Sequence, residues 1–220
     1  MQIAIDGPSG SGKSSVAKNL AKRLGLVHID TGAMYRAVAM AAKLADVEWS
    51  DEKAIYKLIE TSEINIQYRD GTQRIFLDGK DVTENVRSAE MGVGASKVSA
   101  FGGVREKLVA MQQDMAKKVN VVMDGRDIGI KVLPNADVKI FLTADVAVRA
   151  RRRCGELENL GLTWSFEEIS EQIRQRDHED SNRTISPLIK ADDAIEVDAS
   201  NLDIDGVVDK IERIINERGV

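Results

Sequence analysis

The sequence has few of the residues that form cross-links or bind metal ions. Among 220 residues there are one cysteine, Cys154, and two histidines, His28 and His178. A single cysteine excludes a disulfide within the chain, and the three residues together are too few for a typical zinc site. Because scarce cysteine fits a reducing compartment, we expect a cytoplasmic protein.

Long apolar runs and an excess of positive charge are missing as well. No run approaches the roughly twenty apolar residues that a membrane-spanning helix needs, so we expect no membrane association. The formal net charge of -5 disfavours general binding to nucleic acid polymers. The 31 lysines and arginines still allow a local anion site. The length and the 43% hydrophobic content suit a single domain over residues 1–220, with insertions.

The first residues of the chain indicate a buried strand that runs into a phosphate-binding loop. Residues 1–6 are mostly apolar, and the complete pattern G-x-x-x-x-G-K-[ST] follows them and opens a helix. The glycines let backbone N–H groups converge on phosphate oxygens, while Lys13 reaches the β and γ phosphates and Ser14 offers a hydroxyl to Mg²⁺. The helix dipole points at the same anion. We predict that ATP is bound by Gly7, Pro8, Ser9, Gly10, Ser11, Gly12, Lys13, Ser14 and Ser15.

Further along, one segment departs from an otherwise alternating order of strands and helices. Alternating apolar and polar residues over 64–68, followed by Asp70-Gly71, predict a hairpin with a return strand over 73–77. A helix is expected before it, over 50–61, and another should begin near Thr83. The small antiparallel sheet is therefore interpreted as an insertion.

The remaining patterns predict a parallel sheet flanked by helices. Apolar runs typical of buried strands are followed by polar groups, as at the end of the run 119–123, where Asp124-Gly125-Arg126-Asp127 begins. Either Asp30 or Thr31 can cap the helix that carries Tyr35 and Arg36. The other expected strands are 26–29, 138–142 and 194–197. The expected helices include one that carries Val16, Leu20 and Leu24 and has Gly25 as its C-cap, a mainly helical stretch over 83–118 broken around Gly102-Gly103, a polar helix over 166–176, and 204–218. A Gly-punctuated loop is expected near Gly155 and Gly161.

Four blocks of sequence together resemble the bacterial cytidylate (CMP) kinases. They are Gly7 to Ser15, Asp30-Thr31-Gly32-Ala33-Met34-Tyr35-Arg36, Asp124-Gly125-Arg126-Asp127-Ile128-Gly129, and Arg176-Asp177-His178-Glu179-Asp180-Ser181-Asn182-Arg183. The resemblance implies a P-loop nucleoside monophosphate kinase fold of class α/β, with a monophosphate-binding insertion over about 35–99 and a lid over about 149–165. It implies phosphorylation of CMP and dCMP by ATP, with Mg²⁺, in a monomer.

The resemblance also assigns roles to individual residues. It places Arg36 and Arg126 at the acceptor phosphate, and Ser96, Arg105 and Asp127 around the cytosine. The metal-organising pair would be Ser14 and Asp124, acting through phosphates and water. The implied catalytic residues are Lys13, Arg126, Arg149, Arg152 and Arg153, and the implied acceptor-binding residues are Thr31, Tyr35, Arg36, Ser96, Arg105, Asp124, Arg126, Asp127, Arg176, Asp180 and Arg183. Spacings of four and three would bring the last three together if their helix continues.

Several alternatives compete with this interpretation. A GTPase switch lacks support because the Asn-Lys-x-Asp signature that reads guanine is absent. A dinucleotide-binding loop is disfavoured because Ser15 stands where a third glycine or alanine is needed. A kinase of the same fold with another acceptor, such as shikimate or dephospho-coenzyme A, differs mainly in base recognition. Asp124 could instead cap the turn after its strand, and any single arginine among Arg149, Arg151, Arg152 and Arg153 could belong to a solvated helix face.

Overall fold

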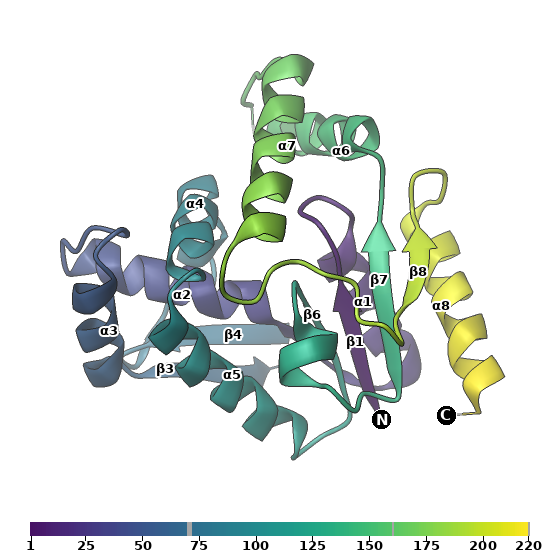
Figure 1. Ribbon diagram of the computed structural model, residues 1–220, viewed down its shortest axis with the longest axis horizontal. Helices are drawn as coiled ribbons and strands as arrows, with labels where there is room; N and C mark the ends of the chain where they lie inside the picture. The colour runs from purple at the N-terminus through teal and green to yellow at the C-terminus, as the bar shows by residue number, and fades with distance from the viewer. Residues whose placement is uncertain (70–71, 160, 220) are drawn as a thin grey trace. The chain divides into compact units, whose positions relative to one another are not determined.

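The computed structural model describes residues 1–69, 72–159 and 161–219 (Figure 1). Two compact units are present. The first combines Met1–Leu26 with Val122–Val220, and the second is the continuous stretch Val27–Val121. The segment 35–99 lies inside the second unit, and its role in binding a monophosphate stays a prediction.

Apolar strands form the predicted parallel sheet. Its order is β2-β6-β1-β7-β8, and β1 pairs in parallel with β7 in a register that sets Ile3 opposite Val138 and Asp6 opposite Phe141. β7 pairs in parallel with β8. The strands are β1 (Gln2–Asp6), β2 (Val27–Asp30), β6 (Val121–Gly125), β7 (Val138–Thr143) and β8 (Ile195–Asp198). All were predicted from their apolar runs, with bounds that differ by one or two residues.

Two terminal helices pack together in the first unit. α1 (Lys13–Leu24) ends at Gly25 in the left-handed conformation, as predicted, and α8 (Ile204–Arg218) packs against it. Their apolar faces share one buried cluster with β1, β7 and β8. At the surface, Arg23 of α1 pairs with Asp205, Asp209 and Glu212 of α8. These contacts fix the helix that follows the phosphate loop.

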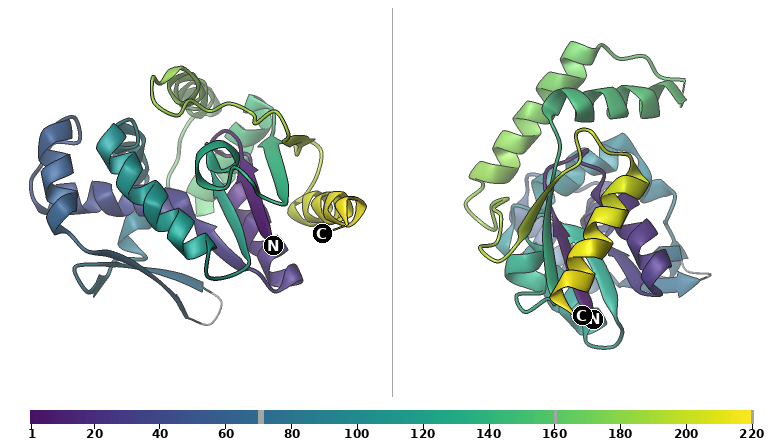
Figure 2. Two further views of the ribbon diagram at one scale, coloured as in Figure 1. Left: turned by 60° about the horizontal axis from the view of Figure 1, so that its bottom comes forward. Right: turned by 90° about the vertical axis from the view of Figure 1, so that its right-hand side faces the viewer.

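A helical hairpin extends beyond the carboxyl end of β7 in Figures 1 and 2. It consists of α6 (Val146–Asn159) and α7 (Phe166–Asn182), and it buries an apolar cluster of its own, made of Ala150, Leu157, Ile169 and Ile173. The Gly-punctuated loop expected near Gly155 and Gly161 was therefore wrong at Gly155. Gly155 lies inside α6, because the apolar contacts outweigh the roughly 1 kcal/mol that one interior glycine costs.

The second unit places helices beside a small antiparallel sheet of order β3-β4-β5. The predicted hairpin strands are confirmed, with Ile64 opposite Leu77, while the turn at Asp70-Gly71 lies outside the described residues. The elements are α2 (Thr31–Leu44), α3 (Glu52–Thr61), β3 (Ile64–Arg69), β4 (Thr72–Leu77), β5 (Lys80–Asp81), η1 (Asn85–Arg87), α4 (Ala89–Val98) and α5 (Gly102–Ala116). Its core centres on α2, whose Met34 and Val38 are fully buried.

A helix starting near Thr83 was a wrong prediction. The Thr83 hydroxyl accepts a hydrogen bond from the Ile75 N–H, and the Thr83 N–H donates to Asp81. These bonds hold the chain against the small sheet just after β5, and only the short 3-10 helix η1 (Asn85–Arg87) precedes the next α-helix. The helix begins only at Ala89, with Ser88 as its N-cap. Within the described ranges, no helix is both long enough and apolar enough to span a bilayer.

Candidate functional site

The loop between β1 and α1 has the backbone that a phosphate cradle requires. A Cβ at Gly7 would lie 2.1 Å from the Leu142 carbonyl oxygen, so only glycine fits there. Gly12, the N-cap of α1, has φ 94 and contributes no side chain to the first helical turn. The N–H groups of that turn are therefore directed toward an anion at the helix N-terminus.

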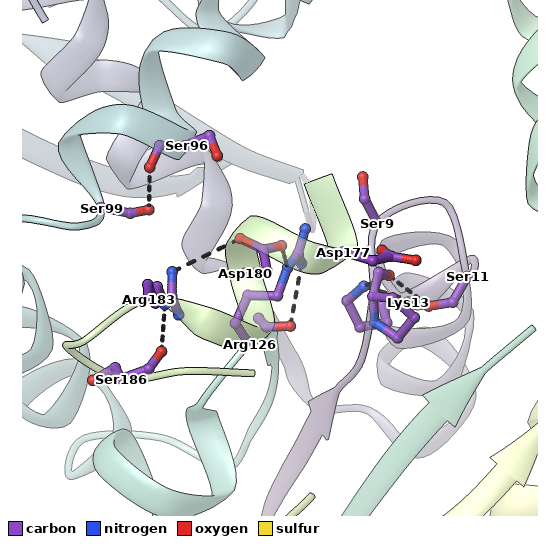
Figure 3. Close-up of polar contacts among 12 residues, drawn as sticks. Ser9, Ser11, Lys13, Ser96, Ser99, Arg126, Asp177, Asp180, Arg183 and Ser186 are labelled. Carbon is purple, nitrogen blue, oxygen red and sulfur yellow. Dashed lines mark hydrogen bonds and ion pairs between the residues drawn. The ribbon is translucent and has the colours of Figure 1, made fainter. Parts of the chain in front are cut away.

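Lys13 is buried, and Figure 3 draws its side chain near Ser11 of this loop. Its Nζ donates to the Pro8 carbonyl at 2.5 Å and lies 3.4 Å from the Ser11 hydroxyl. Burial, followed by the charge of Arg126, lowers the pKa of Lys13 well below its usual value. An anionic phosphate at this position would favour the charged ammonium, which is the form that a nucleotide site needs.

Ser14 and Asp124 bring the phosphate loop and the end of β6 together. The Ser14 hydroxyl donates to Asp124 Oδ2 at 2.6 Å, and Asp124 is 4% exposed. Hard oxygen donors of this kind fit Mg²⁺. In the part of the chain that the structure describes, no cluster of three or more His, Cys, Asp or Glu side chains could hold a metal ion alone. A cation here would share its coordination with phosphate oxygens or water.

Asp180 is a buried carboxylate that pairs with two arginines of the first unit. Asp180 Oδ2 accepts from Arg126 Nε at 2.7 Å, and Asp180 Oδ1 lies 3.9 Å from an Arg183 terminal nitrogen (Figure 3). α7 continues to Asn182, and Arg183 is its C-cap. The helix is therefore long enough for the spacings of four and three to bring Arg176, Asp180 and Arg183 together. Burial raises the pKa of Asp180, but Arg126, Arg176 and Arg183 outweigh burial and lower it below its usual value. The side chain therefore remains a carboxylate that can orient guanidinium groups.

Asp6, which the sequence analysis did not single out, anchors the loop that carries Arg126 and Asp127. Its two carboxylate oxygens accept the N–H groups of Ile128 and Gly129, each at 2.8 Å. Burial raises the pKa of Asp6 to about 6, although both hydrogen bonds act in the opposite direction. The only local signal was a charged residue at the end of an apolar strand.

The four α6 arginines differ in their contacts. Arg149 is buried and contacts Ser9 of the phosphate loop, and Arg152 donates to the Ala199 carbonyl at 2.7 Å and to Ser11 at 3.4 Å. Arg153 pairs with exposed Glu156, and Arg151 lies 6.0 Å from the centre of the Phe166 ring. Two of the four thus reach the loop, while the other two stay on the helical hairpin.

In the second unit, Asp30 organises the start of α2. Its Oδ1 accepts the Ala33 N–H at 3.0 Å, which makes Asp30 the N-cap, and its Oδ2 accepts from Arg36 at 2.8 Å. The side-chain amide of Gln73 on β4 bonds both backbone groups of Asp30. It accepts a hydrogen bond from the Asp30 N–H at 2.8 Å and donates one to the Asp30 carbonyl at 3.2 Å. No sequence pattern pointed to Gln73, which links the small sheet to the candidate phosphate ligand.

The two candidate base-reading residues of the second unit are also linked. Arg105 donates to the Ser99 carbonyl at 3.3 Å, and the Ser99 hydroxyl donates to the Ser96 carbonyl at 2.9 Å. The Arg105 guanidinium lies 5.5 Å from the centre of the Tyr35 ring. Thr31 and Tyr35 are both buried on α2. Tyr35, Ser96 and Arg105, taken from three helices, are therefore close neighbours.

Comparison with known proteins identifies the family. The sequence model of the cytidylate kinase family matches residues 3–217. The chain belongs to the cytidylate kinase family. A cytidylate kinase from Lactobacillus johnsonii is 51% identical over 218 residues, covering 99% of this chain and 95% of that protein. Family membership confirms the resemblance inferred from the four sequence blocks, and with it the kinase class of enzyme.

Another member of the family and a solved structure are also similar to this chain. A cytidylate kinase from Geobacillus sp. is 48% identical, covering 99% of this chain and 97% of its own. Among solved structures, shikimate kinase from Bacteroides thetaiotaomicron matches with a TM-score of 0.50 at 15% identity, covering 98% of each chain. That likeness concerns the fold alone, and it agrees with the predicted P-loop kinase architecture. The roles of individual site residues stay predictions.

Proposed function

We propose that this protein transfers the γ-phosphoryl group of ATP to CMP or dCMP, giving ADP and CDP or dCDP. The observation that carries the proposal is the family match over residues 3–217. The buried Lys13 in its glycine-rich loop supports ATP as the donor. A cytoplasmic location and a monomeric state remain part of the proposal.

The chemistry asks the protein mainly for positioning and charge neutralisation. An oxygen of the acceptor phosphate attacks the γ-phosphorus while the bond to the β,γ-bridging oxygen breaks, and negative charge spreads over the transferred oxygens. Lys13 would neutralise charge on the donor, and Arg36 and Arg126 would hold the acceptor phosphate. Ser14 and Asp124 would hold Mg²⁺, which supplies further neutralisation when it is bound with ATP. A guanidinium of α6, from Arg152 or Arg153, would approach the transferred group.

Cytosine recognition separates this proposal from other acceptors. Cytosine presents an amino donor at position 4 and acceptors at N3 and O2. A carboxylate at Asp127 can accept from the amino group, and Arg105 and Ser96 can donate to the acceptors. Uracil reverses two of these groups, and a site of buried polar groups discriminates strongly against such a mismatch.

The test is acceptor profiling with ATP and Mg²⁺. ADP release should be measured with CMP, dCMP, UMP, AMP, GMP, shikimate and dephospho-coenzyme A at equal concentrations. CMP and dCMP should give the highest kcat/KM. A higher value for any other acceptor would contradict the proposed substrate while leaving the kinase fold and the donor site intact.

A further inference from the structure

Arg149 is held in place by three separate parts of the first unit. Its Nε donates to the Ala144 carbonyl at 2.8 Å, and one terminal nitrogen donates to the Ser9 carbonyl at 3.0 Å. The fork of both terminal nitrogens grips the Asp177 carboxylate at 3.0 and 2.6 Å. The side chain of Arg149 is 5% exposed, so this arrangement is largely shielded from water.

This hydrogen bonding differs from what is expected of an arginine whose N–H donors are available to contact a transferred phosphoryl group. A guanidinium has five N–H donors in a fixed planar fork. Four of the five are engaged in the bonds to Ala144, Ser9 and Asp177. A two-pronged contact with a transferred phosphoryl group would therefore require breaking at least one of these bonds in a buried environment, where an unpaired charge is costly.

The two ends of the arrangement belong to different parts of the proposed reaction. Ser9 lies in the loop that would bind the ATP phosphates. Asp177 lies on α7, directly after Arg176 and three residues before Asp180, and Figure 3 draws it close to the loop that carries Ser9 and Lys13. One guanidinium therefore joins the donor loop to the helix that carries the candidate acceptor ligands.

We propose that Arg149 and Asp177 are positioning residues that couple donor binding to acceptor binding. This inference rests on the proposed function, and it assigns Arg149 a different role from the catalytic one predicted from sequence. Donor phosphates stabilise one conformation of the loop and thereby fix the Ser9 carbonyl. Arg149 transmits that order to Asp177, and α7 then presents Asp180 and its arginines in one orientation. Because coupling between two ligands is reciprocal, the acceptor must raise donor affinity by the same factor.

The experiment measures this coupling factor directly. Isothermal titration calorimetry should give the Kd of CMP alone and with a saturating, non-hydrolysable ATP analogue and Mg²⁺. The Kd of the analogue should be measured with and without CMP. For the wild type we expect the analogue to tighten CMP binding by roughly 5-fold or more, the lower end of common allosteric couplings. Circular dichroism and thermal unfolding confirm that each variant is folded.

Two variants break the link in different ways. Asp177→Asn keeps the size but removes the charge and one accepting oxygen, and Arg149→Lys keeps the charge but loses the planar fork. Each should reduce the coupling factor toward 1 while leaving each Kd for a single ligand within about twofold of the wild type. The double variant should show no further loss, because both changes break the same link. If Asp177→Asn does not fold, Arg149→Lys still tests the proposal.

A matched control lies on the same helix. Glu171 and Arg174 form an exposed ion pair on α7 at 3.1 Å, so Glu171→Gln removes a carboxylate of α7 without affecting the loop. Its coupling factor should equal that of the wild type. A coupling factor that is unchanged in both Asp177→Asn and Arg149→Lys would overturn the inference. It would also be overturned if Arg149→Lys lost 10³-fold or more in kcat with unchanged coupling, since that is the behaviour of an arginine finger. Failure of the proposed function would appear separately, as a wild type that does not phosphorylate CMP.

Discussion

Replacing Asp6 by asparagine should change how the stability of the protein depends on pH. Burial raises the pKa of Asp6 from 3.8 to about 6 in the folded chain, against the effect of the N–H groups of Gly129 and Ile128. Between these two pH values the folded state holds the Asp6 proton while the unfolded state releases it. The contribution of Asp6 to the free energy of unfolding should therefore fall as pH rises from about 4 to about 6, and stay level above that.

The structure sets the size of this effect. A difference of about two pKa units, at about 1.4 kcal/mol per unit, gives about 3 kcal/mol of stability that is present below pH 4 and absent above pH 6. Asp6→Asn removes this dependence. It also adds an offset of about 1–3 kcal/mol at all pH values, because an amide has one accepting oxygen for two N–H groups.

The assay is urea unfolding of the wild type and of Asp6→Asn at several pH values from 4 to 7.5. Subtracting the two curves removes contributions from distant groups that titrate equally in both proteins. Asp6→Leu, which also lacks the carboxyl group, should give a difference curve of the same shape with another offset. A difference that stays constant within about 0.5 kcal/mol over this range would refute the argument from burial.

Four further outcomes are expected. Lys13→Ala should fold but lose several orders of magnitude in kcat, because its ammonium meets phosphate charge that grows in the transition state; activity within tenfold of the wild type in a coupled ADP assay would contradict the loop assignment. A chelator should abolish turnover, and added Mg²⁺ should restore it, since Ser14 and Asp124 supply oxygen donors only; persistent activity in excess chelator would remove the metal from the proposal. Asp127→Asn should lower the ratio of kcat/KM for CMP over UMP, chiefly through loss of CMP use; an unchanged ratio in a variant that uses both would exclude Asp127 from base reading. Gln73→Leu should raise the KM for CMP several-fold with little change in the KM for ATP, because Gln73 fixes the Asp30 peptide and Asp30 holds Arg36; equal changes in both KM values would indicate general destabilisation instead.

Local patterns predicted most of the elements because local physics determines them. Apolar runs indicated all five strands of the large sheet, and Gly25 ends α1 in the left-handed conformation that favours glycine. The helix expected from Thr83 failed because the Thr83 hydroxyl is bonded to Ile75 across the small sheet. Gly155 was misread because the apolar contacts of the α6–α7 hairpin depend on two segments at once.

The difference between local patterns and contacts of distant segments also explains which candidate site residues could be predicted from the sequence. The phosphate loop is one continuous pattern of nine neighbouring residues, so its chemistry could be predicted from the sequence alone. Asp6, Gln73 and Asp177 acquire their roles from partners 122, 43 and 28 residues away. Their residue types are ordinary in their own neighbourhoods, so only the folded chain identifies them.

The division of the chain into one continuous and one split unit has a consequence for synthesis on the ribosome. Val27–Val121 is continuous in sequence, so the contacts within this unit can close as that stretch emerges. β1 and α1 are made before this stretch, yet β1 pairs with β7 and α1 packs against α8, which are made after it. At translation rates of about 5–20 residues per second, β1 waits on the order of ten seconds for β7. Throughout that delay an apolar strand and the glycine loop behind it are exposed to chaperones, so the earliest part of the nucleotide site is the last to be completed.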